Sequence, residues 1–106
     1  MFELDLEGIK SSYIEHNYGY LFYTVTMIED PDVVVELGTY QGYSGLHLAA
    51  GLRDRGRAAS QLSLIDLWDM YAFRHCSLDT TVENFRRNGA LDLDQTKASF
   101  VNESAL

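Results

Sequence analysis

The residues best suited to chemistry follow a short apolar run, in the stretch ELGTYQGYSG from Glu36 to Gly45. Gly38 and Gly42 allow a tight turn with positive φ and let a ligand approach the backbone. Glu36 can accept a hydrogen bond from an ammonium group, and the Ser44 hydroxyl can donate one to a carboxylate. This arrangement predicts a site for an amino-acid-like ligand that carries both charges.

A second candidate group, Asp66, lies 21 residues after Gly45, at the end of the next apolar run. A carboxylate at the end of such a strand can accept hydrogen bonds from both hydroxyls of a ribose, as in dinucleotide-binding folds. Alone, a glycine-containing turn is common and Asp66 would equally serve as a helix N-cap or a solvated loop acid. The two features together favour the ligand hypothesis.

Short apolar runs and stretches with helical spacing alternate along the chain and would position these groups. Three apolar runs predict strands: 33–37, 62–66 and 97–101. Three stretches with helical spacing or capping residues predict helices: 13–30, which would form one helix or two, 43–53 and 77–89. Parallel strands joined by helices need right-handed crossovers, and ligands bind such sheets at the carboxyl ends of the strands. We therefore expect an α/β fold with a three-stranded parallel sheet and flanking helices, in a single domain over residues 1–106.

Particular residues set the boundaries of these elements. Pro31 cannot continue a helix, so the first helix should end just before it. Ser77 or Asp79 can cap the start of the last helix, and Gly89 suits the position after its end. The run VVVEL at 33–37 is typical of a strand that is buried on both faces of a parallel sheet.

Composition and charge exclude several classes of partner. The net charge is −8 and the eight Lys and Arg residues form no long basic run, so nucleic acid is not an expected partner. No run approaches the ~20 apolar residues that span a bilayer, and the N-terminus is acidic, so we expect a cytoplasmic protein without membrane contact. Cys76 is the only cysteine and the three histidines lack ligand spacing, so no metal site is expected. His47 is expected at the surface or at the edge of the core.

Two stretches resemble known motifs. VVVELGTYQGYSG resembles motif I of class I S-adenosylmethionine-dependent methyltransferases and is closest to the ELGxxxGYS form of catechol-type O-methyltransferases. LSLIDLWD is similar to their second motif, especially in a related group in which a Trp closely follows the ribose-binding Asp. The resemblance implies S-adenosylmethionine as the cofactor, a small molecule as the methyl acceptor, and a partial Rossmann-like methyltransferase fold.

The same resemblance implies a role in cofactor binding for individual residues. Five of them would surround the methionine moiety: Glu36, Gly38, Gly42, Tyr43 and Ser44. Asp66 would bind the ribose, and Leu67 and Trp68 would lie on the adenine side. Further candidates near the adenine follow the third strand: Asn102, Glu103 and Ser104. No residue is assigned a catalytic role, because the family's acceptor-contacting residues lie largely beyond the third strand.

The resemblance covers only the first three strands of the family's larger sheet, which correspond to the N-terminal half of such an enzyme. In the family's strand order, the strand at 33–37 would lie at one edge, with unpaired N–H and C=O groups. We therefore expect the chain to pair either with a second copy of itself or with a separate polypeptide that completes the sheet. A truncated domain is equally compatible with the sequence.

Two other functions are compatible with these residues. A non-catalytic module could have kept the S-adenosylmethionine pocket, or only the fold, without transferring a methyl group. A nicotinamide-dependent oxidoreductase would also place an acid such as Asp66 one strand beyond the glycine turn. Against it, the spacing GxxxGxxG departs from GxGxxG, and Glu36 would confront the pyrophosphate.

Overall fold

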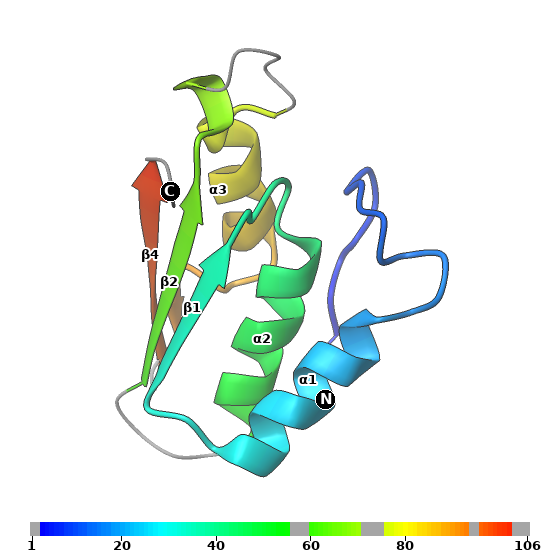
Figure 1. Ribbon diagram of the computed structural model, residues 1–106, viewed down its shortest axis with the longest axis vertical. Helices are drawn as coiled ribbons and strands as arrows, with labels where there is room; N and C mark the ends of the chain where they lie inside the picture. Colours follow the sequence, from blue (N-terminus) through cyan, green and yellow to red (C-terminus); the bar gives the residue numbers. More distant parts are fainter. Residues whose placement is uncertain (1–2, 56–59, 71–75, 94–95, 103–106) are drawn as a thin grey trace.

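A computed structural model of the protein describes residues 3–55, 60–70, 76–93 and 96–102 (Figure 1). The expected contacts of Glu103 and Ser104 lie outside these ranges. The elements follow in chain order: α1 (Gly19–Glu29), β1 (Val33–Leu37), α2 (Tyr43–Asp54), β2 (Ser60–Asp66), the 3-10 helix η1 (Trp68–Met70), α3 (Leu78–Arg87), β3 (Asp92–Leu93) and β4 (Thr96–Asn102). Within the described ranges, no helix has the length and apolar character needed to cross a bilayer.

The sheet has the strand order β1-β2-β4-β3. The pairs β1–β2 and β2–β4 are parallel, which confirms the predicted three-stranded parallel sheet. β3 pairs with β4 in the antiparallel direction and was not predicted, since two residues are too few to show an alternating pattern. β1 lies at the opposite edge, as the strand order implied by the resemblance requires.

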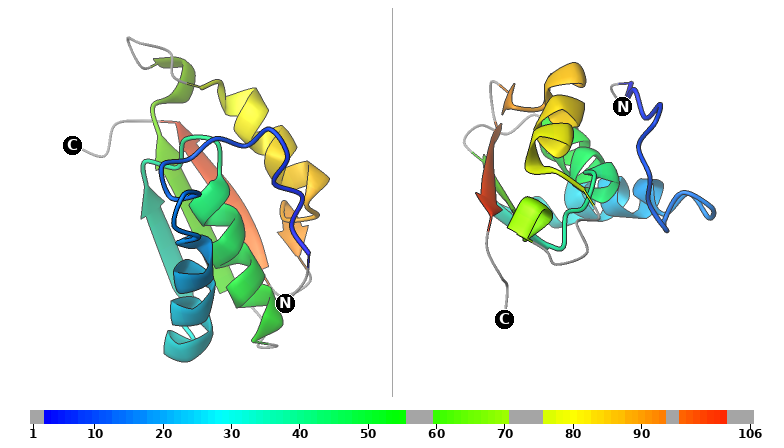
Figure 2. Two further views of the ribbon diagram at one scale, coloured as in Figure 1. Left: turned by 90° about the vertical axis from the view of Figure 1, so that its right-hand side faces the viewer. Right: turned by 90° about the horizontal axis from the view of Figure 1, so that it is seen from above.

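Figures 1 and 2 show that α1, α2 and α3 all cover the same face of the sheet. The prediction that β1 is buried on both faces is therefore wrong. Its residues alternate, and the side chains of Val33, Val35 and Leu37 are 54%, 54% and 63% exposed. The reason is topological: right-handed crossovers that proceed in one direction across a sheet place their helices on one face.

The core lies between this face of the sheet and α2. Four α2 residues and two β2 residues are fully buried there: Leu46, Ala49, Ala50, Leu52, Leu62 and Leu64. α1 packs closely on α2 at Gly51, where a Cβ atom would lie 2.9 Å from the Tyr23 carbonyl oxygen. His47 is only 5% exposed, so it is more deeply buried than expected.

The predicted boundaries are confirmed for α3 and for the end of α1, whereas the predicted start of the first helix is wrong, because residues 12–18 form turns and α1 begins at Gly19. α1 ends at Glu29, and Asp30 adopts a left-handed conformation (φ 48°) before Pro31. Ser77 caps α3, because its Oγ accepts a hydrogen bond from the Thr80 N–H at 3.1 Å. Gly89 follows the helix with a positive φ of 64°.

Candidate ligand-binding site

The carboxyl ends of the three parallel strands meet at one edge of the sheet. The Gly38 N–H donates to the Ile65 carbonyl at 2.8 Å, so the end of β1 stays in register with β2. Asp66 at the end of β2 pairs with Asn102 at the end of β4. Candidate residues from the two motifs and from the third strand therefore lie on neighbouring strands, as the sequence predicted.

The turn between β1 and α2 depends on two glycines for different reasons. Gly38 has a φ of 79° and a Cβ atom there would meet open space, so its backbone conformation alone favours glycine. Gly42, the N-cap of α2, has a φ of 100°, and a Cβ atom would lie 2.6 Å from Cε1 of Phe85. Packing and conformation together therefore exclude other residues at Gly42.

Glu36 is the buried carboxylate of the site. The Ser44 hydroxyl donates to its Oε2, whereas its Oε1 is buried and has no hydrogen-bond partner. Burial raises the pKa of Glu36 to about 7, the hydrogen bond from Ser44 and the nearby Thr39 hydroxyl lower it in part, and the charge of Asp66 raises it further. Near neutral pH this carboxyl group is balanced between its two protonation states.

Two more polar atoms near these strand ends are buried without a partner: Thr39 Oγ1 and Asn102 Oδ1. A buried polar atom that makes no hydrogen bond costs about 1–3 kcal/mol. Native proteins leave few such atoms, and a cluster of them calls for an explanation such as a missing ligand. Together with Glu36 Oε1, they mark the turn and the strand ends as a place where a polar ligand would complete the structure.

Asp66 binds two backbone amides with its carboxylate. Oδ2 accepts from the Tyr40 N–H at 2.8 Å, and Oδ1 accepts from the Trp68 N–H at 3.0 Å. Both of these residues have positive φ angles, 53° and 42°, which are uncommon for residues with side chains. Asp66 thus stabilises two strained turns.

The other candidates differ in their accessibility. Trp68 is fully buried, and its Nε1 donates to the Tyr40 carbonyl at 2.8 Å. Its indole therefore presents no surface to a ligand, while Leu67 is half-buried. Tyr43 is 5% exposed, and its hydroxyl accepts from the Gly19 N–H at 3.2 Å.

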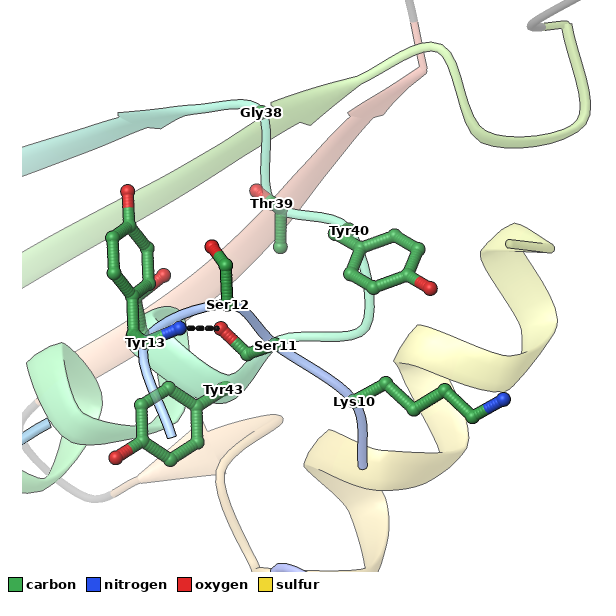
Figure 3. Close-up of a pocket in the computed structure, with 9 residues that line it drawn as sticks. Lys10, Ser11, Ser12, Tyr13, Gly38, Thr39, Tyr40 and Tyr43 are labelled. Carbon is green, nitrogen blue, oxygen red and sulfur yellow. Dashed lines mark hydrogen bonds between the residues drawn. The ribbon is translucent and has the colours of Figure 1, made fainter. Parts of the chain in front are cut away.

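A pocket of about 160 Å³ opens beside the glycine turn (Figure 3). Its lining combines an N-terminal segment with the turn: Lys10, Ser11, Ser12, Tyr13, Gly38, Thr39, Tyr40, Tyr43 and Ser44. Of the predicted site residues it brings together Gly38, Tyr43 and Ser44, whereas the others are not among its lining. The N-terminal segment is held across the turn, because the Lys10 N–H donates to Gln41 Oε1 at 2.8 Å.

Sequence reasoning did not identify several lining residues. Thr39 and Tyr40 lie inside the glycine stretch itself and could have been included from their position. The wall formed by residues 10–13 has no motif that links it to the turn. Within the part of the chain that the structure describes, no group of three or more His, Cys, Asp or Glu side chains could hold a metal ion.

No family model and no curated protein matches this chain. Solved structures do match it, at low sequence identity. The Podospora anserina methyltransferase PaMTH1, in an SAH-bound structure, is 22% identical with a TM-score of 0.59, and the match covers 86% of this chain and 33% of that chain. An O-methyltransferase from Bacillus cereus, in complex with SAH, is 22% identical with a TM-score of 0.55, covering 90% of this chain and 36% of that chain.

The chain thus spans about a third of the length of these two proteins. The matches extend over 86% and 90% of this chain, whose described part consists of a sheet with three parallel strands and helices on one face. The chain therefore has the Rossmann-like fold of class I methyltransferases over the part that it covers.

Proposed function

We propose that the chain binds S-adenosylmethionine at the carboxyl ends of β1, β2 and β4 and forms the cofactor-binding part of a methyltransferase. The observation that carries this proposal is the set of partnerless buried polar atoms at the strand ends: Glu36 Oε1 and Thr39 Oγ1 beside the glycine turn, and Asn102 Oδ1 at the end of β4. They are suited to a ligand with several donors and acceptors. Both solved proteins of similar fold are described in complex with SAH, S-adenosylhomocysteine, which is the demethylated product of this cofactor.

The methionine end of the cofactor suits the region around Glu36. Its ammonium group would donate to the buried Oε1 and favour the charged form of a carboxylate whose pKa is about 7. The carboxylate of the ligand would approach the start of α2, where first-turn N–H groups lack intrahelical partners. Gly38 keeps this approach free of a side chain, Gly42 provides the positive φ and the packing space that the turn needs, and Tyr43 and Ser44 begin the helix.

The nucleoside end is assigned to the ends of β2 and β4. Asp66 lies at the end of β2 and would accept hydrogen bonds from the ribose hydroxyls, because each carboxylate oxygen can accept more than one hydrogen bond. Leu67 and Asn102 would lie on the adenine side, where the free Oδ1 of Asn102 can accept from an amino group. Trp68, which is fully buried, would act by supporting the turn at Tyr40.

S-adenosylmethionine supplies an electrophilic methyl group carried on a sulfonium. The residues of this chain would hold the cofactor and orient it, and rate enhancement would come mainly from placing the acceptor in line with the methyl group. We propose a hydroxyl group on a small molecule as the acceptor. The support for this is the ELGxxxGYS stretch and the name of the Bacillus cereus protein as an O-methyltransferase.

The expectation of a partner chain, either a second copy or a separate polypeptide, stays a prediction. β1 is an edge strand with three exposed apolar side chains, and α1 adds an exposed apolar stripe: Leu21, Val25 and Ile28. Parallel sheets are normally covered on both faces. Sedimentation of the purified chain tests the first possibility, since self-association that Val35→Lys disrupts would support a second copy.

Thermal-shift measurements with three ligands test the proposed cofactor. We expect S-adenosylhomocysteine to raise the Tm of the chain in a concentration-dependent way, because a ligand that binds only the folded state stabilises it. NAD is the comparison ligand for the oxidoreductase alternative, and adenosine tests the nucleoside end alone. A larger shift with NAD than with S-adenosylhomocysteine at equal concentration would contradict the proposal.

A further inference from the structure

Two side chains of α3 bind successive carbonyl groups of the glycine turn. The Thr81 hydroxyl donates to the Tyr40 carbonyl oxygen, and Asn84 Nδ2 donates to the Gln41 carbonyl oxygen at 2.9 Å. Thr81 and Asn84 are three residues apart and therefore lie on one face of the helix. This face of α3 packs against the turn from about 40 residues further along the sequence.

The contact between Thr81 and the Tyr40 carbonyl is buried, and this carbonyl oxygen accepts as many hydrogen bonds as its lone pairs allow. Thr81 is 0% exposed, and its Oγ1 also accepts from Trp68 Nε1 at 2.9 Å. The same Nε1 donates to the Tyr40 carbonyl at 2.8 Å, so this oxygen accepts two hydrogen bonds. Both of its lone pairs are then engaged, which fixes the orientation of the Tyr40–Gln41 peptide.

Tyr40 is held on its other side as well. Its N–H donates to Asp66 Oδ2 at 2.8 Å, and its φ of 53° lies in the left-handed region. A non-glycine residue in such a conformation costs about 1–3 kcal/mol and persists only where surrounding groups determine it. Here those groups come from β2, η1 and α3, because local sequence does not favour the conformation.

We propose that Thr81 and Asn84 are positioning residues for cofactor binding, through the two carbonyl groups that they hold. This inference rests on the proposed function. By holding these carbonyls toward α3, the two side chains preorganise the Tyr40–Gly42 turn before the ligand arrives. Preorganisation raises affinity because the ligand does not have to order the turn.

The variant that tests this is Thr81→Val, which keeps the shape of the side chain and removes the hydroxyl. Calorimetric titration with S-adenosylhomocysteine, well below the Tm, should show binding about three- to tenfold weaker than in the natural chain. Thr81→Ser restores the hydroxyl and should bind within about twofold of the natural chain. Thr80→Val removes a neighbouring hydroxyl whose hydrogen-bond partner is Ser77, the N-cap of α3, and should not change the affinity.

Two outcomes would overturn the inference. One is a Thr81→Val variant that binds as tightly as the natural chain. The other is an equal loss of affinity in Thr81→Val and Thr81→Ser, because a purely structural role would not depend on the hydroxyl. If Thr81→Val does not fold, Asn84→Leu provides the same test at the Gln41 carbonyl, with a comparable loss expected.

Amide hydrogen exchange separates this inference from the proposed function. If the natural chain does not bind S-adenosylhomocysteine at all, the proposed function fails, and exchange at the Tyr40 N–H still reports on the turn. Thr81→Val should then accelerate exchange at Tyr40 relative to Thr80→Val, because a turn that has lost its contact with α3 opens more often and exposes the N–H that Asp66 binds. Unchanged exchange at Tyr40 would show that α3 does not position the turn.

Discussion

The Ser44 hydroxyl donates to one carboxylate oxygen of Glu36 and leaves the other oxygen buried without a partner. Burial raises the pKa of this carboxyl group to about 7, so it is partly protonated at neutral pH. A ligand ammonium group would supply the missing donor and favour the charged form. Glu36 is therefore the residue through which pH should act on binding.

Affinity for S-adenosylhomocysteine should rise with pH up to about 7 and then level off. Below the pKa, each pH unit should weaken binding by up to about tenfold, because the ammonium group binds the deprotonated carboxylate and protonation competes with it. Calorimetry between pH 5.5 and 8 measures the slope. Glu36→Gln should bind weakly with little pH dependence, and the same slope in this variant would exclude Glu36 as the titrating group.

The stability of the ligand-free chain should change with pH in the opposite direction to the ligand affinity, and Glu36 is again the group responsible. A carboxyl group whose pKa is raised from 4.5 to about 7 on folding contributes stability below pH 4.5, and this contribution is lost as the pH rises through 7. The shift corresponds to at most about 3 kcal/mol. Urea unfolding of the natural chain and of Glu36→Gln should therefore give a difference that falls between pH 4.5 and 7.

His47 acts in the other direction within the same pH window, which is why the difference between variants is the useful quantity. Burial lowers the pKa of His47, so its contribution to stability is lost as the pH falls below its ordinary value of 6.5. This contribution is common to the natural chain and Glu36→Gln and cancels in the comparison. A difference that is independent of pH would contradict the assignment to Glu36.

Gly38 and Gly8 form a matched pair for testing the turn. Their φ angles are 79° and 77°, and a Cβ atom at either position would meet open space. Alanine should therefore destabilise both variants similarly, by about 1–2 kcal/mol. Only Gly38 lines the pocket, so Gly38→Ala should weaken ligand binding by about tenfold while Gly8→Ala binds normally. Equal affinities in calorimetric titrations of the two variants would remove Gly38 from the site.

Substitutions at Gly19 and His47 should have non-additive effects on the free energy of unfolding, because α1 and α2 pack closely only where Gly19 has no side chain. A Cβ atom at Gly19 would lie 2.3 Å from Nε2 of His47, which is buried against the start of α1. Gly19→Ala should cost about 1–3 kcal/mol through overpacking. In a double-mutant cycle with His47→Ala, most of this cost should disappear. Additive losses in urea unfolding would show that the clash is relieved elsewhere.

The local sequence pattern predicted the positions of the elements that carry the motifs. The prediction failed where a feature depends on segments that are distant in the sequence. ELGTYQGYSG marks its own turn because glycine, a strand end and a helix start are adjacent in the sequence. The run VVV in β1 has the same pattern whether one face or both faces are covered, and the crossover direction decides between these cases. Sequence therefore predicted the position of β1 but not its exposed face.

The residues that hold the glycine turn in place could not be predicted either, because they come from segments that are distant from it in the sequence. Nothing near Lys10 indicates that its segment crosses to the turn and faces Gly38. Thr81 and Asn84 look like ordinary helix residues in the sequence, and only the packing of α3 brings them to the carbonyls of Tyr40 and Gln41. The fully buried Trp68 was expected to contact the ligand, whereas in the structure its indole binds the turn.

The most direct test of the central claim is calorimetric titration of the purified chain with S-adenosylhomocysteine, repeated with Asp66→Asn. We predict saturable binding at one site per chain, weakened at least about tenfold by Asp66→Asn because the acceptor for the ribose hydroxyls is impaired. Asp32→Asn, a change directly before β1 and so at the opposite end of this strand, is the control and should bind normally. No saturable heat at millimolar ligand, or equal affinity in Asp66→Asn and the natural chain, would contradict a cofactor site at the ends of these strands.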